Sequence, residues 1–315
     1  MNVESEVCDV FVFEKEQKIW NINNVKIGGQ PGAYPTVLIG SIFYDKQKIV
    51  SDRQRGIFDK KKAEELINKQ DEMSDKTGNP CILDIVGDTA VALEKQIDFA
   101  ASVTQAPFLV DSTLPEARLA AIKHAIEVGL VERAIYNSID VHSKENELNT
   151  LQELGVKSSM LLVFSPKALM PEGRIELLKG TGGEKGLIQK AQEAGIQNML
   201  VDTAVLDVVS ISFAAQTIYS VKNEFGLPSG CGPANAITAW KKIKKEFPPT
   251  SYKACISGSV LVTTMMGADF ALYGPIEEAE SVFPACAMVN GIVGYYTKRK
   301  YRIKQEPSHP LNKIF

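Results

Sequence analysis

The chain has 315 residues, of which 44% are hydrophobic and 23% charged, and its formal net charge is −3 with a pI near 5.8. This weakly acidic balance argues against nucleic acid or an anionic membrane as partner, because both are bound through clusters of basic residues. The most apolar tract, Ala254 to Ala268, is too short to span a bilayer, so no membrane insertion is expected.

The N-terminus reads MNVESEVCDVFVFEKEQ, with acidic residues where a secretory signal would carry a basic segment and then a long apolar run. We therefore expect a cytoplasmic protein. The cysteines are odd in number, widely spaced and without a CxxC motif, so neither a disulfide framework nor a metal site is expected. They are Cys8, Cys81, Cys231, Cys255 and Cys286.

The predicted elements begin with residues 1–30, where VFEKEQKIWNINNVKIG indicates a short hairpin that closes one end of the fold. From residue 36, short apolar runs alternate with longer amphipathic stretches, which is typical of βα units around a parallel sheet. Eight runs follow in order: TVLIGSIF (36–43), CILDIVG (81–87), FLVD (108–111), AIYNSI (134–139), SMLLVF (159–164), NMLVD (198–202), LPSGC (227–231) and ADFALYG (268–274).

Several of these runs are apolar almost throughout, as expected when both faces of a strand are covered. A doubly wound open sheet would give a similar pattern. The count of eight, and polar residues at the last position of strand after strand, favour an α/β fold closed into a (β/α)8 TIM barrel. We predict one domain, 1–315, with residues 1–30 as N-terminal cap and 297–315 as a charged tail that is solvated or contacts a partner.

Polar side chains recur where the predicted strands end, and in a closed barrel these ends share one mouth. They are Asp84, Asp111, Asn137, Asp202 and, in the turn after the seventh strand, Asn235. An aspartate directly after a strand is also a common helix N-cap, so each aspartate alone admits both interpretations. The convergence of the whole set favours a binding site.

Carboxylates and carboxamides together suit a guanine-like heterocycle such as a pterin. The pterin ring presents an amino group and a ring N–H, both donors, beside ring nitrogens and a carbonyl that accept. A buried carboxylate accepts from the donor pair, and a carboxamide both donates and accepts. An unpaired carboxylate in such a pocket would cost roughly 1–3 kcal/mol or more.

The segments LVDSTLPEARLAA, AIYNSI, LVDTAVLD and GCGPANA, in this order and spacing, resemble the pterin-binding barrel superfamily. That superfamily includes dihydropteroate synthase and the methyltetrahydrofolate:corrinoid methyltransferases. VKIGGQPGAYPTVLIGSIFY, IVSDRQRGIFDKKKAEELI, EMSDKTGNP and RAIYNS resemble the H subunit of the archaeal tetrahydromethanopterin S-methyltransferase. They resemble still better its bacterial relatives, including the tetrahydrofolate methyltransferase of glycine betaine demethylation.

The resemblance implies roles for individual residues. Asp111, Asn137 and Asp202 would hold the pterin ring, with Asp202 accepting from the exocyclic amine and N3–H. Asn235 would approach the reacting N5, and Asp84 would line the mouth. The surrounding CGPAN segment departs from the LSN-type segment of the bacterial corrinoid enzymes, which leaves Asn235 the least supported of these placements.

The main hypothesis is therefore methyl transfer from a methylated corrinoid (cobalamin), carried by a partner protein, to N5 of tetrahydrofolate. Two alternatives remain: a tetrahydromethanopterin-specific H subunit, and a pterin-binding or corrinoid-docking scaffold without turnover. A dihydropteroate synthase fits less well, since no convincing lysine stands at the seventh strand.

The helical segment VFPACAMVNGIVGYY (282–296) is apolar nearly all round, which a helix on the outside of a barrel should not be if that side met water. Burial in a homodimer interface is the favoured interpretation, and packing against the barrel is the alternative.

Overall fold

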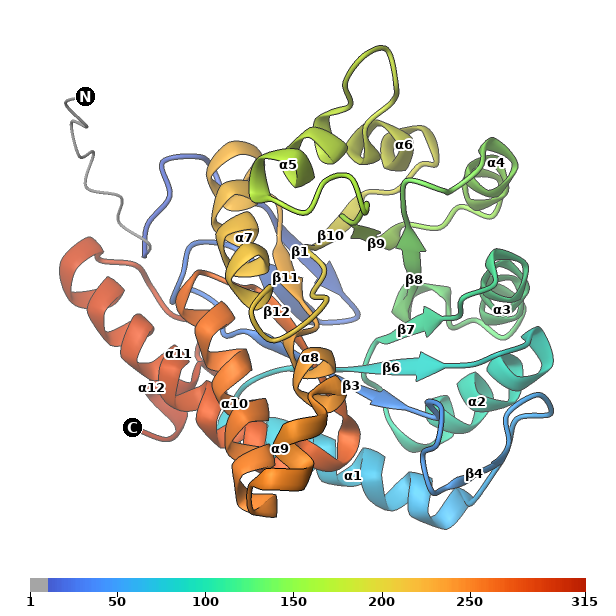
Figure 1. The fold of residues 1–315 in the computed structure, drawn as a ribbon, viewed down its shortest axis with the longest axis horizontal. Coiled ribbons are helices and arrows are strands. Elements are labelled where there is room, and N and C mark those ends of the chain that lie inside the picture. The colour runs from blue at the N-terminus through green and yellow to red at the C-terminus, as the bar shows by residue number, and fades with distance from the viewer. Residues whose placement is uncertain (1–10) are drawn as a thin grey trace.

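The computed structural model describes residues 11–315, so Cys8 and the first part of the predicted cap lie outside the described residues. Eight parallel strands close into a barrel in the order β10-β11-β12-β3-β6-β7-β8-β9 (Figure 1). The predicted barrel is confirmed, and the open sheet is excluded. The strands are β3 (Val37–Ile42), β6 (Cys81–Val86), β7 (Phe108–Asp111), β8 (Ala134–Ile139), β9 (Ser158–Leu162), β10 (Asn198–Asp202), β11 (Ser229–Cys231) and β12 (Phe270–Pro275).

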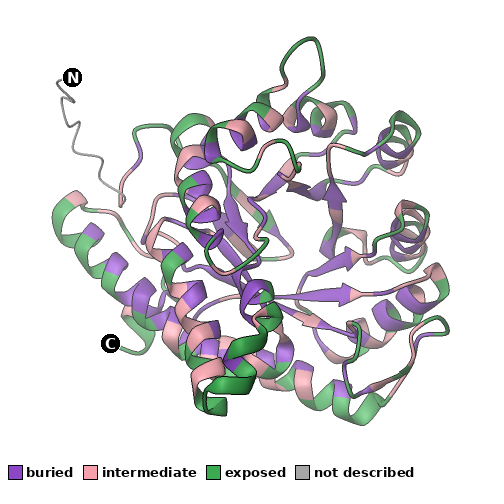
Figure 2. Ribbon diagram, in the orientation of Figure 1, coloured by how far each residue is buried: buried purple, intermediate pink, exposed green. Residues whose placement is uncertain are grey.

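Helices surround the barrel and cover the outer face of its strands, which Figure 2 shows as almost wholly buried. They are α1 (Lys60–Thr77), α2 (Ala90–Val103), α3 (Pro115–Glu127), α4 (Glu145–Glu153), α5 (Pro171–Lys179), α6 (Leu187–Glu193), α7 (Ile211–Phe225), α8 (Pro233–Ala239), α9 (Lys241–Glu246), α10 (Pro249–Met265), α11 (Ala279–Tyr301) and α12 (Pro310–Lys313). Helix α1 shows how sequence sets their limits. Asp59 caps its start by accepting from Lys62 N–H, and Gly78 ends it at φ +84°. A short hairpin, β4 (Val50–Asp52) and β5 (Ile57–Phe58), precedes α1.

Successive side chains of a strand point to opposite faces, and the barrel separates them into two cores. One set packs inside the barrel: Ile39, Ile82, Leu109, Ile135, Met160 and Leu200. Their neighbours, such as Val110 and Val201, pack outward against the helices. The next inward position on each strand is therefore two residues further toward its C-terminal end.

An antiparallel hairpin, β1 (Ile19–Ile22) and β2 (Val25–Gly28), closes the N-terminal end of the barrel, as predicted. Asn23 and Asn24 form its turn with positive φ values of 45° and 69°, the backbone geometry that a tight two-residue hairpin turn requires. Ile22 and Ile27 join the interior cluster of the barrel. Trp20 fixes the hairpin in place by donating from Nε1 to the carbonyl of Met199 at 2.9 Å.

The segment 297–315 keeps its basic residues exposed but is also partly packed, with Thr297, His309 and Pro310 buried. Its first residues extend α11, and the chain then folds back along the barrel. Glu306 pairs with Lys26 of the hairpin at 3.0 Å, and His309 is fully buried. His309 lies so close to Gly294 that a Cβ there would stand 2.7 Å from its ring. The charged residues of this segment thus alternate with residues that pack closely.

Within residues 11–315, no helix combines the length and apolarity needed to cross a membrane.

The hairpin contributes to stability through its inward side chains. We expect Ile27→Ala to lower the free energy of unfolding by about 2–4 kcal/mol, because it opens a cavity in a fully buried cluster. Ile19, on the same hairpin, is 45% exposed, so Ile19→Ala serves as the matched control and should cost less than about 1 kcal/mol. Denaturant unfolding measures both, and equal losses would contradict a closing role for the hairpin.

Candidate functional site

A polar layer lies directly above the aliphatic interior, at the C-terminal end of the barrel. It consists of residues two positions beyond the inward aliphatic side chains, namely Ser41, Asp84, Asp111, Asn137 and Asp202. Strand register places Ser41 beside Asp84 and Asp111 beside Asn137. The structure therefore brings four of the five predicted residues to one end of the barrel interior.

Asp84 is the most enclosed member of this layer, at 3% exposure. Its Oδ2 accepts a hydrogen bond of 2.6 Å from the Ser41 hydroxyl, whereas its buried Oδ1 has no hydrogen-bond partner among the described residues. A buried acceptor without a donor carries the cost of its lost hydration. Asp84 thus offers an unsatisfied oxygen at the floor of the layer.

The carboxyl groups also act on one another. Burial raises the pKa of Asp111 well above its ordinary value, and the neighbouring carboxylate of Asp84 raises it further. Asp202 adds to this effect, and Arg118 opposes it. Burial also raises the pKa of Asp84, to about 6, although hydrogen bonds from Ser41 and Asp111 oppose the rise. Two buried carboxyl groups in contact cannot both be ionised cheaply.

Asp202 stands opposite this pair, on β10. Burial raises its pKa to about 6, while the N–H of Ala204, which Oδ1 accepts at 2.8 Å, lowers it. The charge of Asp84 raises it slightly, which places the two carboxyl groups within electrostatic range. The layer therefore has three acidic groups whose protonation is set by burial.

None of these aspartates caps the helix that follows its strand, so the alternative interpretation of them as N-caps is wrong. Thr89 caps α2, while α3 and α7 begin at Leu114 and Ser210 without a side-chain capping bond. Their carboxyl groups instead lie in the interior of the barrel, at its C-terminal end.

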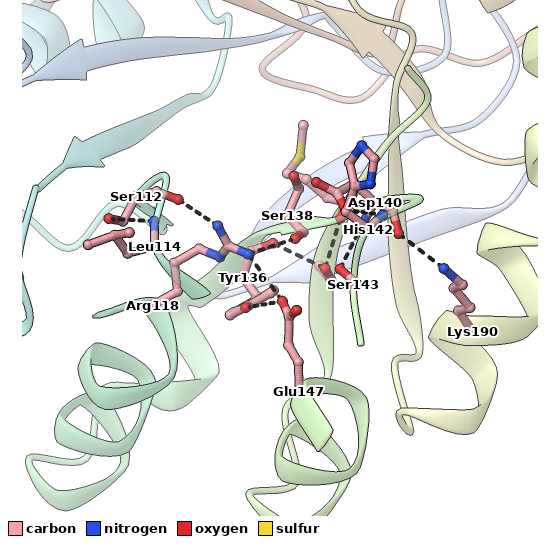
Figure 3. A network of polar contacts seen from close by, with 12 residues as sticks. Ser112, Leu114, Arg118, Tyr136, Ser138, Asp140, His142, Ser143, Glu147 and Lys190 are labelled. Atoms are coloured by element: carbon pink, nitrogen blue, oxygen red, sulfur yellow. Dashed lines mark hydrogen bonds and ion pairs between the residues drawn. The ribbon is translucent and has the colours of Figure 1, made fainter. Parts of the chain in front are cut away.

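Arg118 of α3 holds the backbone directly after two of these residues (Figure 3). Its guanidinium donates to the carbonyl of Ser112 at 2.5 Å and to that of Ser138 at 3.4 Å. These serines directly follow Asp111 and Asn137, so one buried side chain fixes the exits of β7 and β8.

The same guanidinium is held from its other side. It donates to Glu147 Oε1 at 3.1 Å, and the hydroxyl of Tyr136 donates to the same oxygen at 2.5 Å. Its Cζ lies 5.0 Å from the centroid of the Tyr136 ring. Because both charges are buried and paired, removal of either partner would leave an uncompensated charge.

Arg174 of α5 holds the backbone directly after β10 in the same way. This fully buried side chain donates through Nη1 to the carbonyls of Thr203 and, at 3.0 Å, Ala204. Its charge lowers the pKa of Asp202, which burial raises. Two arginines on the surrounding helices thus position the three strand ends that carry Asp111, Asn137 and Asp202.

Sequence reasoning missed Ser41, Arg118 and Arg174. Ser41 could have been found, because it is the polar residue near the end of the run TVLIGSIF and lies two residues after the inward-pointing Ile39. The arginines could not, since an arginine in an amphipathic helix is normally solvated.

Asn235 is placed differently from the other predicted residues. It lies in the first turn of α8, directly after β11, and is exposed. Among the described residues, no hydrogen bond joins its side chain to the acidic layer. It is at the correct end of the barrel but outside the interior.

Residues 11–315 contain no cluster of three or more His, Cys, Asp or Glu side chains arranged to hold a metal ion. His124, on α3, pairs with Asp98 of α2 at 2.7 Å, outside the polar layer.

Comparison with protein families matches residues 15–305 to the family described as tetrahydromethanopterin S-methyltransferase MtrH subunit. The chain belongs to this MtrH family. The match spans the hairpin, the whole barrel and the first part of the C-terminal segment, up to residue 305, and the predicted resemblance to the family is confirmed.

Relatives in the family are similar along their full length. The tetrahydromethanopterin S-methyltransferase H subunit of Methanothermobacter thermautotrophicus is 43% identical, covering 97% of this chain and 100% of the relative. That of Methanosarcina acetivorans is 39% identical, over 97% and 100%. The H subunit of the putative methyltransferase mtx of Methanosarcina barkeri is 41% identical, over 96% and 99%.

Solved structures of dihydropteroate synthase share the fold. The enzyme from Xanthomonas albilineans superposes with a TM-score of 0.59 at 15% identity, covering 88% of this chain and 98% of the other. The enzyme from Thermus thermophilus gives 0.56 at 12% identity, over 87% and 100%. At such identities the likeness establishes the barrel alone.

The raised pKa of Asp202 has a consequence for stability. A carboxyl group with a folded-state pKa of about 6 and an ordinary value of 3.8 stabilises the fold fully below about pH 3.8, and this contribution is lost as the pH rises through 6. Asp202→Asn keeps an oxygen for the Ala204 N–H but removes the charge. We expect the unliganded variant to be about 1–3 kcal/mol more stable than the parent at pH 7 and nearly equal to it at pH 4.

Denaturant unfolding from pH 4 to pH 7 measures this difference. Asp75→Asn, in an exposed position on α1, is the control and should follow the parent at every pH. If Asp202→Asn were less stable than the parent at pH 7, the folded protein would already stabilise the ionised carboxylate of Asp202, which contradicts the prediction.

Proposed function

We propose that this member of the MtrH family transfers a methyl group between N5 of a reduced pterin and a corrinoid cofactor carried by a partner protein. The observation that carries the proposal is the polar layer, in which buried carboxyl groups and a carboxamide face one barrel end in a chain of this family. The corrinoid would supply the metal that accepts or gives the methyl group.

The polar layer matches the donors and acceptors of a pterin ring. Asp202 would accept from the exocyclic amine and N3–H when ionised. Asn137 both donates and accepts, and a protonated Asp111 that turns from Asp84 to the ligand would provide a further donor for a ring nitrogen or carbonyl. Binding of ring N–H groups would supply the partner that the buried oxygen of Asp84 lacks.

We propose tetrahydromethanopterin as the pterin. The relatives that match over their full length are named for it, which favours this alternative over the tetrahydrofolate hypothesis of the sequence analysis. Tetrahydrofolate presents the same ring, and the polar layer contacts ring atoms, so the choice depends on the parts of the pterin outside that layer.

In the transfer step, this chain would act through positioning. The methyl carbon must lie in line between N5 and the metal, and holding two large reactants in register lowers the barrier substantially. Asn235 is proposed to face N5, where its amide accepts from protonated N5 or donates to the neutral nitrogen. Its exposed place above β11 agrees with a residue that meets both reactants.

Apolar side chains on two neighbouring loops support docking of a protein partner at this end. Leu169 and Met170 lie between β9 and α5, and Leu206 and Val209 lie between β10 and α7. Val209 is 77% exposed, and the other three are 41–53% exposed. Exposed apolar clusters of this kind are typical of interaction surfaces.

The function is tested by titrating the purified protein with tetrahydromethanopterin and with tetrahydrofolate, followed by methylcobalamin turnover measured from the corrinoid spectrum. We expect tighter binding of tetrahydromethanopterin by at least about tenfold, a difference of about 1.4 kcal/mol. Tighter binding of tetrahydrofolate would reinstate the first hypothesis, and binding without methyl transfer would support the scaffold.

Variants assign the roles. Asp202→Asn should weaken pterin binding by about tenfold or more, because it loses a charge-assisted hydrogen bond worth about 1.5–3 kcal/mol, and Asp111→Ala should weaken it because it removes the carboxyl donor. Asn235→Ala should lower the turnover number while pterin affinity stays within about twofold, since an interaction made only in the transition state affects kcat. The control Asp75→Asn should change neither. Unchanged pterin affinity in both aspartate variants would show that the acidic layer does not bind the pterin.

The partner surface is tested with Val209→Asp, which places a charge in the proposed apolar contact. We expect the KM for the protein-carried corrinoid to rise about tenfold, while turnover with free methylcobalamin is unchanged. Val262→Asp, on α10 and 51% exposed, is the control for adding a charge. Equal losses with free and carried corrinoid would contradict docking at these loops.

A further inference from the structure

Between β11 and α10 the chain forms an excursion at the C-terminal end of the barrel (Figure 1). The strand β11 is the seventh of the barrel along the chain, and two short helices, α8 and α9, follow it before α10 begins. The buried face of α8 packs through Ala234 and Ile237 into a cluster that includes Val260 of α10 and Tyr273 of β12. Apolar packing therefore holds the excursion against the barrel, and its other face is exposed.

The exposed part of this excursion is strongly basic. Residues 241–253 contain five lysines and one glutamate, in a chain whose formal net charge is −3. Every residue of α9 except Ile243 is exposed, as Figure 2 shows. Among the ion pairs of residues 11–315, none involves a lysine of α9. These lysines, which are Lys241, Lys242, Lys244 and Lys245, can therefore bind an anion without losing a partner within the chain.

The exposed groups follow one another in a definite order along the excursion. Asn235, which is proposed to face N5, and Thr238 lie three residues apart, so they share the exposed face of α8. Trp240 comes next and is partly exposed, with its ring 6.4 Å from that of Phe247. Lys241 then begins α9, a step from Asn235 that corresponds to about 9 Å at 1.5 Å per residue. The surface is thus amide, aromatic and basic in turn.

A reduced pterin cofactor carries its groups in the same order. Its ring bears at C6 a side chain with an aryl amine and, beyond this, anionic groups. These are carboxylates in tetrahydrofolate, and a phosphate with carboxylates in tetrahydromethanopterin. With the ring in the polar layer, this side chain would leave through the C-terminal mouth, because the hairpin closes the other end. In barrels of this class, the loops after the seventh and eighth strands frequently bind phosphate groups.

We propose that the lysines of α9 bind the anionic end of the pterin side chain and that Trp240 contacts its aryl ring. This inference rests on the proposed function and names the residues that distinguish one pterin from another. A phosphate adds charge to the carboxylates, so lysines that pair with it favour tetrahydromethanopterin over tetrahydrofolate. An acidic protein surface would match the lysines but not their order behind an amide and an aromatic ring, so the pterin side chain is the favoured occupant.

The test compares pterins with and without this side chain by calorimetry. Lys241 and Lys245 lie four residues apart, so the variant Lys241→Gln/Lys245→Gln removes two charges from one face of α9. We expect it to weaken tetrahydromethanopterin binding by about fivefold and tetrahydrofolate binding by about twofold at low salt. Binding of 6-methyltetrahydropterin, which has the ring but no anionic side chain, should be unchanged. The control Lys18→Gln/Lys123→Gln removes two exposed lysines, one beside the N-terminal hairpin and one on α3, and should leave all three affinities unchanged.

A second pair of variants tests the aromatic contact. Trp240→Ala should weaken the binding of both complete pterins by about fivefold, because it removes the ring that packs against their aryl group. Trp240→Phe keeps an aromatic face and should recover most of this affinity. Neither variant should change the binding of 6-methyltetrahydropterin, whereas damage to the barrel mouth would weaken all three ligands alike.

The outcomes separate this inference from the proposed function. An α9 variant that binds every pterin as the parent does, or that loses the ring compound equally, would overturn the inference, while pterin binding in the polar layer would stand. A raised KM for the protein-carried corrinoid with unchanged pterin affinity would assign α9 to the protein partner instead. A parent chain that binds none of the three pterins would overturn the inference and the proposed function together.

Discussion

The organisation of this protein depends on a layer of acidic groups that the barrel does not fully satisfy by itself. Closing eight parallel strands directs every second side chain into one interior, and at the C-terminal end these positions hold Asp84, Asp111 and Asp202. The Ser41 hydroxyl donates one hydrogen bond to Asp84, and the Ala204 N–H donates one to Asp202. A ligand rich in N–H donors would offset the cost of burying these carboxyl groups, so the layer would give up stability in exchange for binding.

The acidic layer keeps its shape because charged side chains on the helices hold the strand exits. Arg118 and Arg174 are buried, and each donates to backbone carbonyls directly after a strand. Backbone carbonyls are fixed by the fold, whereas side chains rotate, so this arrangement positions the strand ends without neutralising the aspartates. Substitutions at either arginine would therefore act on the site from outside it.

Much of this could be predicted because several barrel strands are short apolar runs with a polar residue at or near the C-terminal end, as in β7 and β10. Asp84, Asp111, Asn137 and Asp202 were found by that position alone. Helix arginines could not be assigned, since their sequence context is the same for a solvated and a buried side chain. The packing of the segment 297–315 was missed for a related reason: its many charges conceal the few buried residues, such as His309, that fix it. The choice of pterin would depend on groups outside the acidic layer, because several pterins share the ring that this layer is proposed to bind.

The hairpin at the opposite end limits how molecules can exchange. Because Ile22 and Ile27 fill the N-terminal opening, a small molecule in the polar layer has one route in and out, through the face that a docking partner would cover. With a partner docked there, the order of events would be fixed: the small molecule would enter first, the partner would arrive second, and departure would follow the reverse order. Such a cycle would be governed by how long the partner stays, and excess partner would slow it by trapping the bound molecule.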